Sequence, residues 1–301
     1  MPKQNRVLHF AASIARTFHL WPIIAKTGAF NRARRRKYPD TIVRLDVVIT
    51  ECCTLRCRHC SNLMQYYHDP ENLDADEVIS SLSRLLIAMR VCHLKILGGE
   101  PFVSQKILIR ILDSLRNEAK DRYDSIEIIT NGTIIPSDDC IRAMKETPGI
   151  KVVFSNYGEL SSKLNEFTMI CKREGISYDV VEEEFWWNFG EVKLREEKES
   201  KTQHRYDGCY SRRLCTTLYR GKLYVCPRQA HAIHLGLIPD EDTESVDVLK
   251  PEYEESIVMR EAVYGLIDRK ERITACKYCG CDAGTRVPRA EQAERAFDAR
   301  C

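Results

Sequence analysis

The sequence lacks several features that would place the protein in other classes. Its formal net charge is only +2 over 301 residues, so we expect no general nucleic-acid-binding surface. No internal repeat or low-complexity tract is evident, and 44% hydrophobic with 30% charged residues is typical of a globular chain. The sequence shows no cleavable apolar leader, and its N-terminal apolar stretch is too short and too charged to span a bilayer. We therefore expect a cytoplasmic protein.

Acidic residues are absent from the first 39 positions, which contain nine lysines and arginines. Val7, Phe10, Ile14 and Phe18 recur at helical spacing, and Asn5 is a suitable N-cap, so region 1–40 is predicted to form a basic amphipathic helix. Such a helix could lie on an anionic membrane surface, and the alternative is that it packs on the rest of the protein. The arginine-rich run could touch RNA, but no recognisable RNA-binding module accompanies it, so a nucleic-acid partner is not expected.

Cysteine is abundant, and its spacing is informative. Cys53, Cys57 and Cys60 form the pattern C-x3-C-x2-C. Zinc sites prefer two C-x2-C pairs or one such pair with histidines, so this pattern suits zinc poorly. A disulfide framework is disfavoured in a chain of this length with thiols bunched at metal-ligand spacings. The three cysteines therefore indicate a metal centre of another kind.

The three cysteines and a glycine-rich turn each follow directly after a short predicted strand. The β-branched segment Val43–Thr50 leads directly into the cysteines, and Leu94–Leu97 leads into Gly98-Gly99-Glu100-Pro101. In a parallel α/β sheet, the carboxyl ends of the strands meet at one edge. We expect the thiols and the glycine turn to lie together.

This combination of motifs resembles the radical SAM superfamily. The resemblance implies that Cys53, Cys57 and Cys60 hold a 4Fe-4S cluster, whose fourth iron binds the amino and carboxylate groups of S-adenosylmethionine (SAM). It also implies that Gly98, Gly99 and Glu100 approach the methionyl ammonium of SAM, with Glu100 as a hydrogen-bond acceptor. An external electron donor of the flavodoxin or ferredoxin type follows from this chemistry.

The remaining pattern predicts an α/β fold, a partial (β/α)6 barrel in residues 41–204. The apolar periodicity predicts helices over 76–90, 104–120, 137–147 and 160–174, alternating with strands over 125–130, 151–155 and 176–180. Such alternation favours a parallel sheet with right-handed crossovers.

Polar residues at the predicted strand ends are candidate SAM ligands. Thr130 and Asn131 follow one strand, and Ser155 and Asn156 follow the next. The alternative for Asn131 is turn chemistry with Gly132. By resemblance, His59 occupies a position where the family usually has an aromatic ring near adenine, and a histidine can stack there as well.

Six further cysteines lie between residues 205 and 285. They are Cys209, Cys215, Cys226, Cys276, Cys279 and Cys281. The stretch from Cys215 to Cys226 predicts a hairpin turning at Arg220-Gly221, with both cysteines on one face. Together with Cys276-x2-Cys279, it resembles the twitch or SPASM auxiliary-cluster region. Residues 205–301 are thus predicted to form a small hairpin and helix domain that carries a second 4Fe-4S cluster.

Spacing does not settle which four of the six thiols bind that cluster, because Cys209 also lies at a distance before Gly221 that SPASM-like sequences allow. We favour Cys215, Cys226, Cys276 and Cys279 as its ligands. A structural zinc site with the same ligands is the alternative. Two thiols would remain, and Cys209 and Cys281 are candidate hydrogen-atom donors, as in radical SAM epimerases; otherwise they are small buried hydrophobes.

The segment Glu182–Phe189 contains adjacent Trp186 and Trp187 beside acidic residues. It could form a sugar-stacking wall, although core packing is the commoner role of tryptophan. The resemblance favours a radical SAM enzyme that abstracts hydrogen from a C–H bond of a sugar or aminocyclitol, leading to epimerisation or alcohol oxidation. A peptide-modifying radical SAM enzyme is the first alternative. A non-catalytic iron–sulfur or zinc protein is the second.

Overall fold

The computed structural model describes residues 40–119, 121–182, 184–281 and 285–293. The predicted N-terminal helix lies outside these ranges. The strands are β1 (Thr41–Val48), β2 (Arg90–Leu97), β3 (Tyr123–Thr130), β4 (Ile150–Asn156), β5 (Ser177–Glu182), β6 (Phe185–Trp187), β7 (Thr216–Tyr219), β8 (Lys222–Tyr224), β9 (Val246–Asp247) and β10 (Arg286–Pro288). The α-helices are α4 (Ala75–Ala88), α5 (Gln105–Glu118), α6 (Asp138–Glu146), α7 (Leu164–Glu174), α8 (Glu199–Gly208), α9 (Tyr210–Leu214), α10 (Pro227–His234) and α11 (Ser256–Ile267). Short 3-10 helices are η1 (Met64–Tyr66), η2 (Pro101–Ser104), η3 (Gly158–Leu160), η4 (Asp242–Glu244), η5 (Pro251–Tyr253) and η6 (Thr274–Tyr278).

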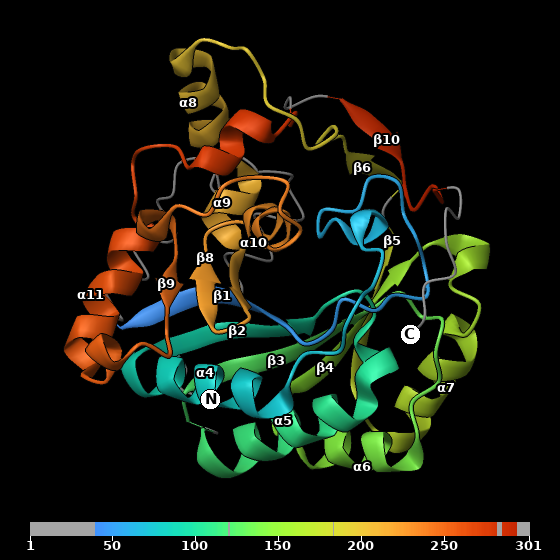
Figure 1. The fold of residues 1–301 in the computed structure, drawn as a ribbon. Helices are drawn as coiled ribbons and strands as arrows, with labels where there is room; N and C mark the ends of the chain where they lie inside the picture. Colours follow the sequence, from blue (N-terminus) through green and yellow to red (C-terminus); the bar gives the residue numbers. More distant parts are fainter. Residues whose placement is uncertain (1–39, 120, 183, 282–284, 294–301) are drawn as a thin grey trace, which may run out of the picture.

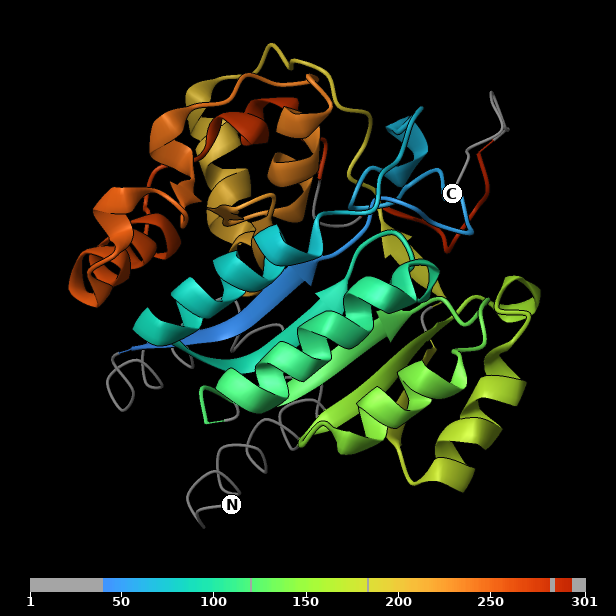
Figure 2. The same cartoon turned by 60° about the horizontal axis from the view of Figure 1, so that its bottom comes forward.

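Strands β1 to β5 alternate with helices α4 to α7, and neighbouring strands are parallel. The helices cover one face of this sheet (Figures 1 and 2). This confirms the predicted α/β class, and each predicted helix and strand of this half is found with bounds shifted by a few residues. The sheet is open, with the order β5-β4-β3-β2-β1-β7-β8-β9.

Local sequence explains where the helices begin and end. The side chain of Asp74 accepts a hydrogen bond from the Glu77 amide at 2.9 Å, and Ser137 caps α6 in the same way. These caps satisfy amide groups that have no partner inside the helix. Helix α7 ends at Gly175, whose φ of 71° suits glycine.

The predicted hairpin is present, and it extends the same sheet. Arg220 and Gly221 connect β7 to β8 with φ values of 48° and 70°, as a two-residue hairpin turn requires. Strand β7 also pairs in parallel with β1, so a sixth parallel strand lies on the far side of β1 from β2. Helix α8 runs across residue 205, where the sequence suggested a domain boundary.

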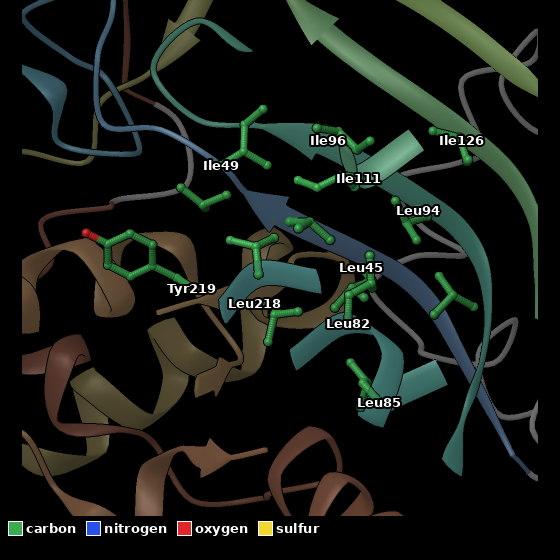
Figure 3. Close-up of a cluster of buried hydrophobic side chains, with 14 of the residues drawn as sticks. Leu45, Ile49, Leu82, Leu85, Leu94, Ile96, Ile111, Ile126, Leu218 and Tyr219 are labelled. Carbon is green, nitrogen blue, oxygen red and sulfur yellow. The ribbon is translucent and has the colours of Figure 1, made fainter. Parts of the chain in front are cut away.

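The core lies between the sheet and its helices (Figure 3). Leu45 of β1, Leu94 and Ile96 of β2 and Ile111 of α5 are completely buried against one another. Full burial of each such side chain contributes about 1.5–3 kcal/mol to folding. Leu218 of β7 belongs to the same cluster, which ties the hairpin to the β/α half.

The opposite face of the sheet is polar. Asp46 of β1 stands in register with Lys95 of β2, which in turn pairs with Glu127 of β3 through an ion pair of 2.7 Å. Glu127 is in register with Lys151 of β4. A row of alternating charges therefore crosses four strands on the face away from the helices.

None of the helices in the described part of the chain has the length and apolar character needed to cross a membrane.

Candidate functional site

The loop that follows β1 carries Cys53, Cys57 and Cys60 as free thiols. Burial and, to a smaller extent, the neighbouring Cys60 together raise the pKa of Cys57 to about 12. The pKa of Cys53 is likewise raised, by burial first and also by Cys60 and Cys57. The three thiols therefore lie close enough to affect one another's charge.

These thiols fit the donor set of an iron–sulfur cluster. In the described residues, no three His, Cys, Asp or Glu side chains converge closely enough to hold one metal ion. A 4Fe-4S cluster attaches each thiolate to a different iron, so its ligands need not converge on one point. Three free thiols on a single loop match that requirement.

The glycine turn after β2 presses directly against the cysteine loop. The amide of Gly99 donates to the Thr50 carbonyl at 2.9 Å, and the Glu100 amide donates to the Cys52 carbonyl at 2.8 Å. A side chain at Gly98 or Gly99 would overlap the Thr50 or Cys52 carbonyl oxygen, so only glycine permits this approach. The structure thus brings the two motifs together as the sequence predicted.

Glu100 is fully buried and is held by three donors from the protein itself. Its Oε1 accepts from the Thr130 hydroxyl at 2.9 Å and from the Phe102 amide at 3.2 Å, and its Oε2 accepts from the Asn131 amide at 2.8 Å. Burial raises the pKa of Glu100 to about 7, and the three hydrogen bonds oppose this shift. The carboxylate therefore joins the glycine turn to the end of β3. Its expected contact with the SAM ammonium stays a prediction.

Asn131 reaches the cysteine loop. Its Nδ2 donates to the Thr54 hydroxyl at 3.0 Å and lies 3.8 Å from the Cys53 Sγ. Its Oδ1 accepts from the Thr133 amide, so the side chain also makes the turn that was its alternative role. Cys53, Glu100 and Asn131 therefore form one connected group.

Ser155 and Asn156 lie farther along the sheet edge, at the end of β4. The Asn156 Nδ2 donates to Glu182 at 2.6 Å, and its Oδ1 accepts from the Gly158 amide. The Ser155 carbonyl accepts from Ser161. No contact in the described residues joins either side chain to the cysteine loop, and their SAM-binding role stays a prediction.

His59 lies against a segment that the sequence did not connect with this site. Its Nε2 lies 3.7 Å from a carboxylate oxygen of Glu291. The neighbouring Gln292 forms an antiparallel bridge with Cys57, and its Nε2 lies 3.3 Å from the Cys57 Sγ. Whether His59 packs on adenine stays a prediction.

A second group of thiols surrounds Cys226, at the start of α10. The pKa of Cys226 is raised well above its ordinary value, by burial first and then by Cys209, Cys279 and Cys276. Burial first, and then Cys209 and Cys279, raise the pKa of Cys276 to about 12. The pKa of Cys281 is also raised, by burial first and then by Cys279 and Cys209. These five thiols therefore lie in one neighbourhood.

Cys215 has different surroundings. Burial raises its pKa to about 12, Arg44 opposes this shift, and Asp46 adds to it. Cys209 also adds to this shift. The Cys215 thiol therefore lies near the charged pair on β1. In that pair, Arg44 Nε donates to Asp46 Oδ1 at 2.6 Å.

The turn that carries Cys276 and Cys279 is held by α8 and the segment before it. Arg205 donates to the carbonyls of Cys276 at 3.2 Å and Cys279 at 3.0 Å. The Gly280 amide donates to the Phe189 carbonyl at 2.7 Å. Segments far apart in sequence therefore fix the geometry of this turn.

Arg228, which the sequence did not single out, lies between the two thiol groups. Its positive charge lowers the pKa of Cys60 in the first group and of Cys281 in the second, against the larger effect of burial. The side chain is 7% exposed and donates to the Gly190 carbonyl at 2.6 Å. Its position two residues after Cys226 was the one available signal.

Aromatic residues of β6 are only partly covered. Phe185 and Trp187 are 51% and 46% exposed, so they do not form a core. Trp186 packs edge-on against Tyr157, with ring centroids 5.5 Å apart. Strand β6 pairs with β10, and the two lie near the cysteine loop (Figure 1).

A buried polar network connects the cysteine loop to the hairpin. The Tyr67 hydroxyl lies 2.7 Å from Nδ1 of His231 and 3.1 Å from the Tyr219 hydroxyl. Tyr219 donates to Glu51, which also accepts from Arg220 at 2.8 Å. No sequence pattern predicts this network, because its members lie on four separate segments.

Comparison with known proteins assigns part of the chain. Residues 47–169 match the family model described as the Radical SAM superfamily. A GTP 3',8-cyclase of Bradyrhizobium diazoefficiens is 28% identical over 106 residues, which are 35% of this chain and 31% of that protein. A GTP 3',8-cyclase of Clostridium acetobutylicum is 26% identical over 140 residues, 45% of this chain and 42% of that protein. The chain thus spans less than half the length of these curated relatives.

Solved structures are similar at a lower level. Streptococcus suis SuiB bound to S-adenosylmethionine gives a TM-score of 0.44 at 13% identity, covering 87% of this chain and 80% of SuiB. BtrN in complex with AdoMet and 2-DOIA gives 0.43 at 14% identity, covering 80% of this chain and 94% of BtrN.

Proposed function

From the premise that residues 47–169 belong to the radical SAM superfamily, we propose that this chain cleaves SAM reductively and abstracts a hydrogen atom from a substrate C–H bond. When bound, a 4Fe-4S cluster supplies the electron that cleaves SAM, and the adenosyl fragment of SAM takes the hydrogen atom. Cys53, Cys57 and Cys60 would hold this cluster.

One observation carries the proposal: three free thiols lie on one loop, and the Gly98-Gly99 turn lies directly against that loop. The absence of a side chain at Gly98 and Gly99 lets the turn pack against the backbone of the cysteine loop. Asn131 and Glu100 fix the position of both segments through hydrogen bonds of 2.8–3.0 Å. The binding surface for SAM is therefore preorganised.

The second thiol group is proposed to hold an auxiliary 4Fe-4S cluster. The electrostatic coupling favours Cys209, Cys226, Cys276 and Cys279 as its ligands, with Cys209 in place of Cys215. Cys281 then stays as the candidate hydrogen-atom donor. Zinc at the same residues is the competing occupant.

For the substrate we propose a small polyhydroxylated molecule, a sugar or an aminocyclitol. The half-exposed Phe185 and Trp187 offer flat apolar faces of the kind that stack on sugar rings. Arg228 places a buried positive charge between the thiol groups. The curated relatives are named for a reaction on GTP, which contains a ribose. Epimerisation and alcohol oxidation are the two proposed outcomes.

The test is anaerobic reconstitution with iron and sulfide, followed by iron counting and detection of 5′-deoxyadenosine after SAM and dithionite are added. Wild-type protein should bind about eight irons, as two 4Fe-4S clusters require, and should form deoxyadenosine. Cys57→Ala should abolish deoxyadenosine formation. Cys140→Ala is the matched control, because Cys140 is buried in α6 outside both thiol groups. Cleavage that persists in Cys57→Ala would refute the proposal.

The same iron count distinguishes the two ligand sets. Cys209→Ala should lower the iron content towards about four, whereas Cys215→Ala should keep all of it. The reverse result would support the set that contains Cys215 in place of Cys209. If the wild-type protein contains one zinc ion per chain, the second thiol group holds a structural zinc site and not an auxiliary cluster.

A further inference from the structure

Residues 286–293 form a strap across the cysteine loop. Its first part, β10, pairs with β6, and its last part pairs with residues 56–58. The Arg58 amide donates to the Glu291 carbonyl at 2.7 Å, and the Ala293 amide donates to the Arg56 carbonyl at 2.7 Å. Figures 1 and 2 show this red segment beside the blue loop that follows β1. The loop thus acquires a strand partner about 235 residues away in sequence.

The side chain of Gln292 is oriented unambiguously within this strap. Its Oε1 accepts from the Arg56 amide at 2.8 Å, and its Nε2 donates to the Ala290 carbonyl at 2.6 Å. A flipped amide would set two donors against each other at Arg56 and two acceptors against each other at Ala290. The group that faces the Cys57 Sγ at 3.3 Å is therefore an N–H donor.

We propose that Gln292 is a positioning residue that donates a hydrogen bond to the Cys57 thiolate and thereby raises the reduction potential of the bound cluster. This inference rests on the proposed function, because it requires Cys57 to be a cluster ligand. Gln292 acts through Cys57 and does not touch SAM or substrate in the proposal.

The physical reason is electrostatic. A donor aimed at a ligand sulfur withdraws electron density from the thiolate, which favours the cluster state that carries one more negative charge. Reduction takes up one electron from an external one-electron reductant, and the hydrogen bond strengthens as that electron arrives. The Gln292 Nε2–H therefore stabilises the reduced form more than the oxidised form.

Nearby charges of the strap do not reproduce this effect. Glu291 lies 3.4 Å from Arg58 and 3.7 Å from His59, so its carboxylate faces basic side chains of the loop and not a thiol. Within residues 286–293 of the strap, the contact with a thiol of the first group is made by Gln292. Its substitution should therefore change the potential while the strap stays in place.

The experiment compares midpoint potentials of the reconstituted full-length protein, measured by redox titration with EPR detection of the reduced cluster. Gln292→Leu removes the donor and keeps the side-chain volume. Gln292→Glu keeps an acceptor for the Arg56 amide and replaces the donor with a negative charge. Both should shift the midpoint to a more negative potential, and Gln292→Glu should shift it further.

Gln65→Ala is the matched control. The side-chain amide of Gln65 also binds the cysteine loop, but it donates to the Arg58 carbonyl, at 3.1 Å, and not to a thiol. The midpoint potential of the cluster in Gln65→Ala should equal that in the wild-type protein. Equal iron contents in all four proteins would show that cluster binding is preserved.

The outcomes separate the two proposals. If wild-type protein holds the cluster and cleaves SAM while both Gln292 variants keep the wild-type midpoint, the role of Gln292 is refuted and the proposed function stands. If wild-type protein holds no redox-active cluster, both are refuted.

Discussion

The imidazole of His231 is fully buried, and its two nitrogens have different surroundings. Nδ1 lies 2.7 Å from the Tyr67 hydroxyl, whereas Nε2 has no hydrogen-bond partner in the part of the chain that the structure describes. Burial is the largest cause of its lowered pKa, about 3, and the positive charge of Arg220 adds to it. The ring therefore stays neutral at physiological pH.

This burial makes folding stability depend on pH. The unfolded chain binds a proton at His231 below about pH 6.5, and the folded chain does so only near pH 3, so stability falls as the pH drops through 6.5. When the pH falls from 7.5 to 5.5, protonation of His231 in the unfolded chain should lower the free energy of unfolding by about 1.4 kcal/mol. His231→Asn keeps an acceptor for Tyr67 and removes the titration. Urea unfolding of both proteins at the two pH values should show a smaller loss in the variant, and equal losses would contradict this.

At the scale of secondary-structure elements, the turn between β2 and η2 packs directly on backbone atoms of the cysteine loop. A Cβ at Gly99 would overlap the Cys52 carbonyl and come near the Cys53 Cβ. Both are backbone or near-backbone atoms of the cysteine loop, so they cannot rotate away. Any side chain at this position must displace the loop itself.

Gly99→Ala should therefore lower cluster occupancy while the fold persists. We expect the variant to lose most of the iron held by the first thiol group, and its helical circular dichroism should match the wild type. Gly265→Ala is the control, since Gly265 lies within α11 and an added Cβ there meets no atom within 4 Å. That control should keep full iron content and gain up to about 1 kcal/mol of stability from its helix propensity. Full occupancy in Gly99→Ala would contradict the proposed packing.

Most of the elements could be predicted from the sequence, because their signals are local. The helices of the β/α half follow an apolar periodicity with caps such as Asp74 and Ser137, and the hairpin turn follows from Arg220-Gly221. The charge row through Lys95 and Glu127 was not predicted, since it arises only when separate strands align in register. Residues 1–39 lie outside the described part, so the prediction for them stays open.

At the scale of the whole molecule, a network of charges joins the start and the last third of the chain. Arg220 of the hairpin donates to Glu51 at 2.8 Å and to Glu71 at 2.7 Å. Glu51 is almost fully buried, and His234 of α10 lies 3.2 Å from it. The cysteine loop and the hairpin therefore share one buried carboxylate.

Removing the cation should leave that carboxylate without its main partner. Arg220→Met should destabilise the protein by about 2–3 kcal/mol, a value lowered from that of a fully buried pair because the Arg220 side chain is 32% exposed. Arg142→Met is the control, because Arg142 pairs with Asp139 on the surface of α6 and its loss should cost less than about 0.5 kcal/mol. Urea unfolding measures both. Equal effects would show that the network contributes nothing special.

The first thiol group could be predicted from sequence because its three cysteines and the glycine turn are short motifs. Spacing alone cannot tell whether Cys209 or Cys215 lies nearer to Cys226, so the ligand set of the proposed second cluster stays a prediction. That choice depends on the pairing of β7 with β1, which directs Cys215 towards Arg44. Gln292 carried no signal at all, because its partner lies 235 residues away.

The strap also orders events during synthesis. Cys57 leaves the ribosome long before Gln292, and domains emerge and fold from the N-terminal side. Until residues 291–293 have been synthesised, the cysteine loop lacks its strand partner. The packing around Cys57 is therefore completed late in synthesis, when this distant segment docks on the loop.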